Sequence, residues 1–248
     1  MNLKGKVKSL TEIQYKTAII SGKVQKQYKG QWTKYSFNEK GFLIEKTDFE
    51  PNKRSHYHYD SLGKLISMKN YGRDSSLTST HTFKYDSAGN QVEDNIENVN
   101  AADKGHNAKY IYKYDEKRNC IEMSGFNSKG IYFTKYSYKY NSAGNKIEEI
   151  WFKANGDTIH TYTYKYNGKG NKIEEHYKYT SNGGGKNKTI YKYDSKGSLI
   201  EENWGGTEGN VIEKVTYTPD NNFNWIKKIT TENKEPSSIT EREIEYFK

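Results

Sequence analysis

Aromatic and polar residues alternate in short stretches along this chain, and the stretches recur at a regular interval. Three copies are nearly identical: YKYNSAGNKIEE from Tyr138, YKYNGKGNKIEE from Tyr164 and YKYDSKGSLIEE from Tyr191. Looser copies begin at Tyr35, Tyr57, Phe83 and Tyr112, and a degenerate copy begins at Tyr217. The second aromatic residue of each copy follows the one before it by 22 to 29 residues, most often by 26. A sustained period of this length predicts a repeat architecture.

Each copy has the pattern of a β-hairpin. Its Tyr-x-Tyr stretch alternates aromatic and polar residues, which is the period of a half-buried strand. An Asp or Asn then begins a turn, and in most copies a Gly three residues later supplies the positive φ that such turns need. The following Lys-Ile-Glu-Glu stretch is the return strand. We therefore predict an all-β fold, an antiparallel meander of about eight hairpin repeats with a period of about 26 residues, forming a curled sheet, shell or spiral.

The charges along the hairpins indicate one strand register. If Asn167 pairs with Lys172 around a four-residue loop, Lys165 faces Glu174 and Tyr162 faces Tyr177. The same register sets Tyr136 opposite Trp151 and forms four further charge pairs, Lys84–Glu93, Lys113–Glu122, Lys139–Glu148 and Lys192–Glu201. Opposite charges that face each other across strands stabilise a sheet. We expect one face to carry Tyr and Ile and the other to carry Lys and Glu, with Cys120 on the polar face.

The repeats predict a single β-hairpin array over residues 1–248. Residues 1–34 are an N-terminal partial repeat, 35–216 hold the regular repeats, and 217–248 hold a degenerate repeat and a C-terminal cap. Gly5-Lys6-Val7 has the pattern of the second half of a repeat whose first half is missing. Residues 240–248 still alternate, and we expect them to form a closing strand.

Composition favours a thin structure with little deep core. Apolar residues make up 32% of the chain, yet it has 23 tyrosines, whose rings can be buried while their hydroxyls stay in water. The net charge of +9 comes from lysines spread along the chain with glutamates close by, so it indicates a solvated surface. The single cysteine excludes an internal disulfide, and no apolar run is long enough to span a membrane. We expect any export signal to lie upstream of Met1, and exposed end strands to allow self-association by edge pairing.

The string Tyr-x-Tyr-Asp-x-x-Gly-Asn, followed by an aliphatic residue, resembles the YD repeat of the RHS family. It is clearest at Tyr57–Gly63, Phe83–Asn90 and Tyr191–Gly197, and the resemblance extends from about residue 35 to about residue 220. It implies a spiralling β-sheet that can form a hollow shell, in bacterial proteins that are secreted or on the cell surface. Some members enclose a C-terminal toxin. The repeats here are longer than the usual unit, and residues 1–248 include no non-repeat C-terminal domain that could serve as a toxin.

The sequence predicts no catalytic centre, cofactor or metal site. The paired glutamates, such as Glu148-Glu149, recur in copy after copy, and neighbouring strand residues point to opposite faces, so a glycosidase pair is not indicated. His56 and His58 share a strand face but have no evident third ligand. The glycine run at 183–185 lacks the spacing of a phosphate-binding loop. We therefore expect the chain not to be an enzyme.

The aromatic residues are the candidate binding surface. Trp151, Tyr177 and Trp204 occupy equivalent places, four residues after the aliphatic residue of the return strand, and Tyr136 and Tyr162 face two of them. These side chains form either a core column or a platform that stacks sugar rings. Bases of single-stranded nucleic acid also stack on aromatics, but the lysines alternate to the opposite face, so we expect no nucleic acid partner.

We expect a non-catalytic repeat scaffold that is secreted, periplasmic or at the cell surface and binds a glycan or another envelope protein. The alternative is a fragment or relative of an RHS-type shell involved in toxin display or encapsulation.

Overall fold

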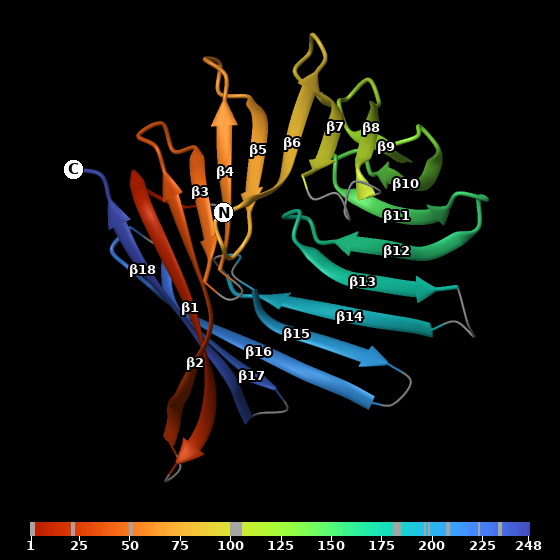
Figure 1. The fold of residues 1–248 in the computed structure, drawn as a ribbon. Helices are drawn as coiled ribbons and strands as arrows, with labels where there is room; N and C mark the ends of the chain where they lie inside the picture. The colour runs from red at the N-terminus through yellow and green to blue at the C-terminus, as the bar shows by residue number, and fades with distance from the viewer. Residues whose placement is uncertain are drawn as a thin grey trace. The chain divides into compact units, whose positions relative to one another are not determined.

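The computed structural model describes residues 3–20, 23–49, 52–99, 106–180, 185–195, 197, 199–206, 209–222, 224–232 and 235–248. These ranges contain 18 β-strands and no α-helix (Figure 1). Strands that follow one another along the chain pair antiparallel through hairpins. The predicted all-β antiparallel meander is therefore confirmed.

The chain divides into two compact units, Met1–Thr80 with Ile212–Lys248 (unit 1) and His81–Val211 (unit 2). The strands of unit 1 are β1 (Val7–Ile20), β2 (Lys23–Phe37), β3 (Leu43–Asp48), β4 (Lys53–Tyr59), β5 (Leu65–Tyr71), β17 (Trp225–Glu232) and β18 (Glu235–Tyr246). The strands of unit 2 are β7 (Gln91–Asn98), β8 (Ala108–Tyr114), β9 (Cys120–Asn127), β10 (Tyr132–Tyr140), β11 (Lys146–Lys153), β12 (Thr158–Tyr166), β13 (Lys172–Tyr179), β14 (Gly185–Tyr193) and β15 (Leu199–Gly206). Residues of β6 (Leu77–Tyr85) and β16 (Gly209–Pro219) belong to both units. The single array over 1–248 stays a prediction.

The predicted charge pairs are all present. Lys84–Glu93, Lys113–Glu122, Lys139–Glu148, Lys165–Glu174 and Lys192–Glu201 have N–O distances of 2.5–2.8 Å. Tyr136 pairs with Trp151 and Tyr162 with Tyr177, also as predicted. Hydrogen bonds from Lys165, His176 and Lys188 lower the pKa of Glu174 to about 2. The register of the hairpins is thus confirmed.

The predicted four-residue loop is wrong, because the turn has three residues. The backbone N–H of Asn167 donates to the carbonyl of Asn171 at 3.0 Å, and Gly170 sits between them with a φ of 79°. This is a favoured hairpin turn that ends with a left-handed residue. A β-bulge then shifts the register between Lys165 and Tyr166. The bulge contains one extra residue in the return strand, which compensates for the loop being one residue shorter than predicted. The rest of the hairpin therefore keeps its predicted partners.

The same bulge corrects the predicted placement of isoleucine and cysteine. Tyr114 pairs with Cys120 while Lys113 pairs with Glu122, so Ile121 and Glu122 both oppose Lys113. Cys120 therefore lies with Tyr114 on the face that carries the tyrosines (the tyrosine face), and Ile121 lies on the opposite, polar face, where it is 39% exposed. The predicted faces of Cys120 and Ile121 are therefore wrong.

Tyrosine hydroxyls join successive repeats of unit 2. The second tyrosine of a repeat donates to a backbone carbonyl at the start of the preceding return strand. The bonds of 2.6–2.8 Å run from Tyr114 to Gln91, Tyr140 to Cys120, Tyr166 to Lys146 and Tyr193 to Lys172. These four hydroxyls therefore have a protein acceptor on the neighbouring strand in addition to the water that the sequence predicted.

Replacing Tyr166 with phenylalanine is expected to lower the free energy of unfolding by about 1 kcal/mol, because the carbonyl of Lys146 loses its hydroxyl donor. Urea unfolding followed by circular dichroism measures the change. Tyr28→Phe is the matched control, since Tyr28 is 63% exposed and should be neutral. Equal stability of Tyr166→Phe and the wild type would contradict a structural role for these hydroxyl bonds.

The last strand and the first strand form one hairpin-like pair in unit 1. β1 pairs antiparallel with β18, with Val7 opposite Tyr246, and the N–H of Phe247 donates to the carbonyl of Lys6 at 2.8 Å. Gly5 has a φ of 78°, the conformation of the turn glycines in the regular repeats. β18 thus pairs with the half repeat predicted at Gly5-Lys6-Val7 as the other strand of its hairpin. The closing strand expected over residues 240–248 is confirmed.

The deepest packing lies at this closing pair. The buried apolar side chains in the described part of the chain are Val7, Leu10, Ile13, Val215 and Ile239, all in unit 1. Leu10 has no exposed surface. The fold therefore has a small core beside β1 and β18, and elsewhere relies on half-buried aromatic rings.

Candidate functional site

Four of the five predicted stacking residues lie together on the tyrosine face of unit 2. Tyr136 of β10 stacks on Trp151 of β11, with ring centroids 5.4 Å apart and an angle of 10° between the planes. Tyr162 of β12 packs against Tyr177 of β13 at 4.8 Å. The side chain of Trp204 lies outside the described part of the structure.

A histidine that the sequence analysis did not single out joins the two pairs. His160 of β12 lies opposite Trp151, 4.9 Å from it, and 5.4 Å from Tyr177. Its Nδ1 is 2.7 Å from the hydroxyl of Tyr177. Its position opposite Trp151 follows from the pairing of β11 with β12, which belong to successive repeats. We call Tyr136, Trp151, His160, Tyr162 and Tyr177 the aromatic row.

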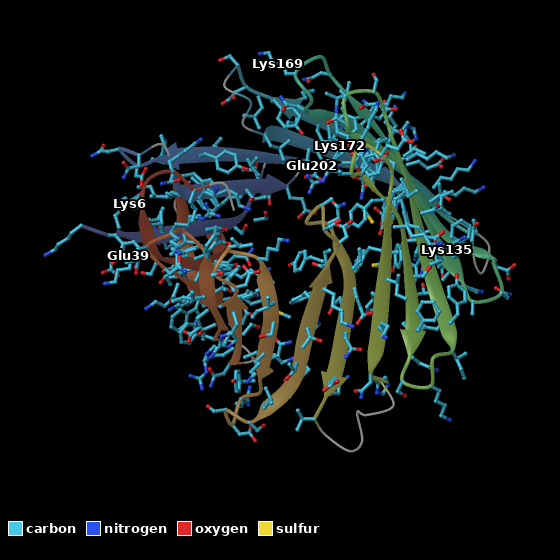
Figure 2. The ribbon with its side chains drawn as sticks, turned by 90° about the horizontal axis from the view of Figure 1, so that it is seen from above. Lys6, Glu39, Lys135, Lys169, Lys172 and Glu202 are labelled. Carbon is cyan, nitrogen blue, oxygen red and sulfur yellow. The ribbon has the colours of Figure 1, made fainter. Side chains whose placement is uncertain are left out.

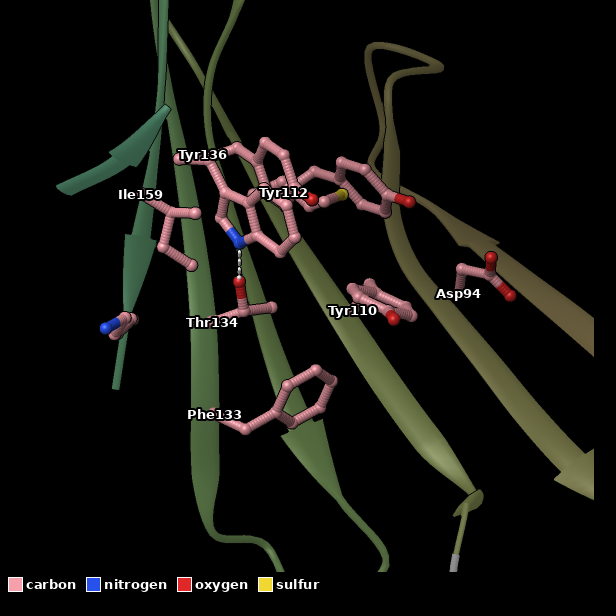
Figure 3. A pocket seen from close by; sticks show the side chains of 10 residues that line it. Asp94, Tyr110, Tyr112, Phe133, Thr134, Tyr136 and Ile159 are labelled. Carbon is pink, nitrogen blue, oxygen red and sulfur yellow. Dashed lines mark hydrogen bonds between the residues drawn. The ribbon is translucent and has the colours of Figure 1, made fainter. Parts of the chain in front are cut away.

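One end of the aromatic row borders a cavity of about 380 Å³. The cavity is lined by Asp94, Tyr110, Tyr112, Met123, Phe133, Thr134, Tyr136, Trp151, Lys153 and Ile159. Figure 3 shows Tyr110 between Thr134 and Asp94. The indole N–H of Trp151 donates to Thr134 Oγ1 at 2.5 Å, which fixes the orientation of the ring.

The polar groups around the cavity are few. Asp94 Oδ1 lies 3.2 Å from Nδ1 of His81, and Lys153 is exposed. Burial, followed by the charge of Asp94, raises the pKa of Tyr110, and burial, followed by Glu149, raises that of Tyr136. Both hydroxyls therefore stay protonated at neutral pH and remain available as donors. An aromatic cavity with a few fixed polar groups is typical of a small-ligand site.

Lysines and glutamates also occupy the tyrosine face, which the sequence analysis assigned to tyrosine and isoleucine. Lys172 forms an ion pair with Glu175 at 2.5 Å and lies 4.5 Å from the centre of the Tyr191 ring. Burial lowers the pKa of Lys172, but hydrogen bonds to Glu175 and Tyr191 outweigh this effect and raise it. Figure 2 shows Lys172 and Glu202 on one side of the unit 2 sheet and Lys135 on the other. The β-bulge places these lysines here, and the pairing largely neutralises their charge.

Alkaline pH is expected to destabilise the fold in the range above the ordinary tyrosine pKa of about 10. Burial, followed by the charge of Asp94, raises the pKa of Tyr112 to about 12. A raised folded-state pKa means that the stability contribution is complete below pH ~10 and is lost as the pH rises toward 12. Spectroscopic titration of tyrosinate, with unfolding followed in parallel, should show a late-titrating group of tyrosines. Titration of every tyrosine at its ordinary pKa in the folded chain would contradict the burial.

Other candidate chemistry is sparse within the described ranges. They contain no group of three or more His, Cys, Asp or Glu side chains arranged to hold a metal ion. His56 Nε2 lies 3.0 Å from Glu45 of the neighbouring strand. No helix among the described residues is both long and apolar enough to cross a membrane.

No family model matches the sequence, and no curated protein matches it either. Among solved structures, a porin-like protein from Bacteroides uniformis is 11% identical, with 98% of this chain and 99% of that one covered and a TM-score of 0.52. A porin-like protein from Bacteroides vulgatus is 9% identical, with the same coverage and a TM-score of 0.44. A TcdB2-TccC3-Cdc42 structure is 17% identical over 88% of this chain, has a TM-score of 0.44, and is matched over 12% of its own length. The similarity to the Bacteroides uniformis protein shows the fold alone. The resemblance to the RHS family rests on the repeat motif.

Proposed function

We propose that this chain is a non-catalytic hairpin-repeat scaffold that binds a glycan at the aromatic row. The observation that supports the proposal most strongly is the half-buried row itself, which borders a cavity of about 380 Å³. Tyr136, Trp151, His160, Tyr162 and Tyr177 each keep part of their surface exposed, so the rings of the row are accessible to a ligand.

The chemistry of the site suits a sugar ring. One face of a pyranose presents C–H groups, which carry a slight positive charge and pack against the negative face of an aromatic ring. The ring edge presents hydroxyls, which need hydrogen-bond partners. Asp94 and Tyr110 offer an acceptor and a donor at the cavity, while Trp151 and Tyr136 offer flat apolar surface.

Nucleic acid fits the same surface less well. Binding of single strands combines stacking with cations that follow the phosphates. On the tyrosine face, Lys146 and Lys172 are already paired with Glu149 and Glu175, and Asp94 adds a negative charge at the cavity. Phosphate groups would meet these carboxylates, so an uncharged ligand is favoured.

The proposal includes a location outside the cytoplasm, in the secreted, periplasmic or cell-surface space where such glycans occur. This location follows from the class of ligand, and cell fractionation of the native organism tests it. The absence of catalysis is also a proposal, which an assay for oligosaccharide products after prolonged incubation with each polysaccharide would test.

The decisive experiment is a binding screen against soluble polysaccharides at near-physiological salt, with tryptophan fluorescence as the first readout. Binding should saturate for one glycan class. Trp151→Ala and Tyr177→Ala should then each weaken binding about ten-fold or more, measured by calorimetry, because each removes a ring of the stacking surface.

Tyr28→Ala serves as the matched control, because Tyr28 is 63% exposed in unit 1 and outside the aromatic row. Circular dichroism and urea midpoints confirm that the variants are folded. No binding across the panel, or binding that Trp151→Ala leaves unchanged, would contradict the proposed function.

A further inference from the structure

One segment departs from the mixture of lysine and glutamate found along the rest of the chain. Between Ile13 and Asn38 there are five lysines, Lys16, Lys23, Lys26, Lys29 and Lys34, and no Asp or Glu. These five charges exceed half of the net charge of +9. The even spread of charge predicted from the sequence therefore does not hold for this segment.

The segment forms the extended hairpin of β1 and β2, whose strands have 14 and 15 residues. The ladder of β1 with β18 ends at Lys16, and that of β2 with β3 begins only at Thr33. Between these limits β1 and β2 pair with each other as far as Ile20 and Lys23. The outer part of the hairpin is therefore a two-stranded arm within unit 1, which Figure 1 shows running past the ends of β17 and β18.

The end of the arm is apolar and exposed. Ile19, Ile20 and Val24 are 53%, 43% and 39% exposed, and Ile19 pairs with Val24 at the tip. An isolated two-stranded ribbon has no second layer to cover such side chains. These residues make a small apolar tip that nothing else in the described part of unit 1 covers.

Lysines and aromatic rings follow behind the tip. Tyr15 lies opposite Lys29, four residues from Ile19, which is about 13 Å along a strand. Tyr28 is 63% exposed, and Lys29 Nζ lies 3.7 Å from the ring centre of Trp32. Lys26 is partly neutralised by Glu241 at 2.5 Å, so the cations available to a partner are chiefly Lys16 and Lys29. Ile19 and Val24 thus lie farther along the arm than Lys16 and Lys29, and Lys23 pairs with Ile20 at its end.

We propose that the β1–β2 arm docks onto the surface of an anionic lipid membrane. Apolar side chains of a peripheral protein enter the boundary between headgroups and acyl chains by about 5–10 Å, and Lys16 lies three residues from Ile19, about 10 Å along a strand. Lysines at that depth meet the lipid phosphates, and tyrosine and tryptophan favour the interfacial layer. A purely polyanionic partner would use the lysines but leave the apolar tip in water.

Cosedimentation with phosphatidylcholine vesicles that contain phosphatidylglycerol tests the proposal. The full chain should partition onto these vesicles, bind weakly to phosphatidylcholine alone, and dissociate as salt is raised. Lys16→Gln with Lys29→Gln should reduce partitioning roughly thirty-fold, at about 1 kcal/mol for each lysine. Ile19→Ser with Val24→Ser should reduce it about ten-fold or more.

Lys40→Gln with Lys169→Gln is the control of equal charge change, because both lysines lie exposed in turns of the regular repeats. This control should retain binding. No partitioning onto anionic vesicles, or an equal loss in the control, would overturn the proposal. Vesicle binding that is unchanged by Ile19→Ser with Val24→Ser would also overturn it, because this would indicate a general polyanion site. So would the loss of a dimer in this variant, measured by light scattering, because this would indicate that the tip binds a second copy of the chain.

Discussion

Replacing Leu10 with alanine is expected to lower the free energy of unfolding by about 3 kcal/mol, within the usual 2–5 kcal/mol for a buried leucine. Leu10 is fully buried and belongs to β1, between β18 and β2. The fold has few deeply buried apolar side chains among its described residues, and they gather beside this strand. The cavity left by alanine would therefore weaken the pair that joins the two ends of the chain.

Urea unfolding monitored by circular dichroism measures the loss. Leu62→Ala is the matched control, because Leu62 is 82% exposed in a turn and its truncation should change stability by less than about 0.5 kcal/mol. Equal effects of the two substitutions would mean that β1 does not pack against a core.

Joining Lys248 to Lys4 by a peptide bond, with residues 1–3 removed, is expected to raise the free energy of unfolding by about 3–5 kcal/mol. Closing the chain removes conformational entropy from the unfolded state, and a ring of this length approaches the upper part of that range. The folded state should accept the bond because Phe247 N–H already donates to Lys6 at 2.8 Å. The new turn, Lys248-Lys4-Gly5, would have the length of the regular turns and a glycine that already has a φ of 78°.

Thermal and denaturant unfolding of the cyclic and linear chains measures this gain. A cyclic chain closed through a long flexible linker is the control, and it should gain less. A cyclic chain less stable than the linear one would show that β18 and β1 do not complete a repeat.

Charge and turn residues predicted much of the fold. The spacing of lysine and glutamate in each repeat is enough to set the register of its hairpin, and five ion pairs confirm that register. The half repeat at Gly5-Lys6-Val7 was also visible, because its glycine keeps the spacing of the other turns. These features are local, so a period along the sequence reveals them.

The β-bulge was not predictable in the same way. A single extra residue after each turn leaves the distant pairs in register yet exchanges the faces of Cys120 and Ile121. Alternation alone cannot detect it, because both readings give the same Lys–Glu pairs. The hydroxyl bond from Tyr140 to Cys120 follows from strand packing between repeats and has no signature within one repeat.

For the candidate site, the aromatic positions could be predicted, but the polar partners could not. Tyr136 and Trp151 follow from the hairpin register. His160 faces Trp151 through the pairing of β11 with β12, and Asp94 comes from β7 of another hairpin. The β1–β2 arm was not predicted, because its lysines follow one another along the chain as those of the repeats do. What distinguishes it from the repeats is that its segment between Ile13 and Asn38 has no Asp or Glu and that its outer part is two-stranded.

The measurement that tests the central claim most directly is a crystal structure of the chain with an oligosaccharide of the glycan class that the screen selects. We predict a sugar ring stacked on Trp151 beside Tyr136, with its hydroxyls bonded to Asp94 or Tyr110. A sugar bound elsewhere, or an empty aromatic row at saturating ligand, would contradict the account.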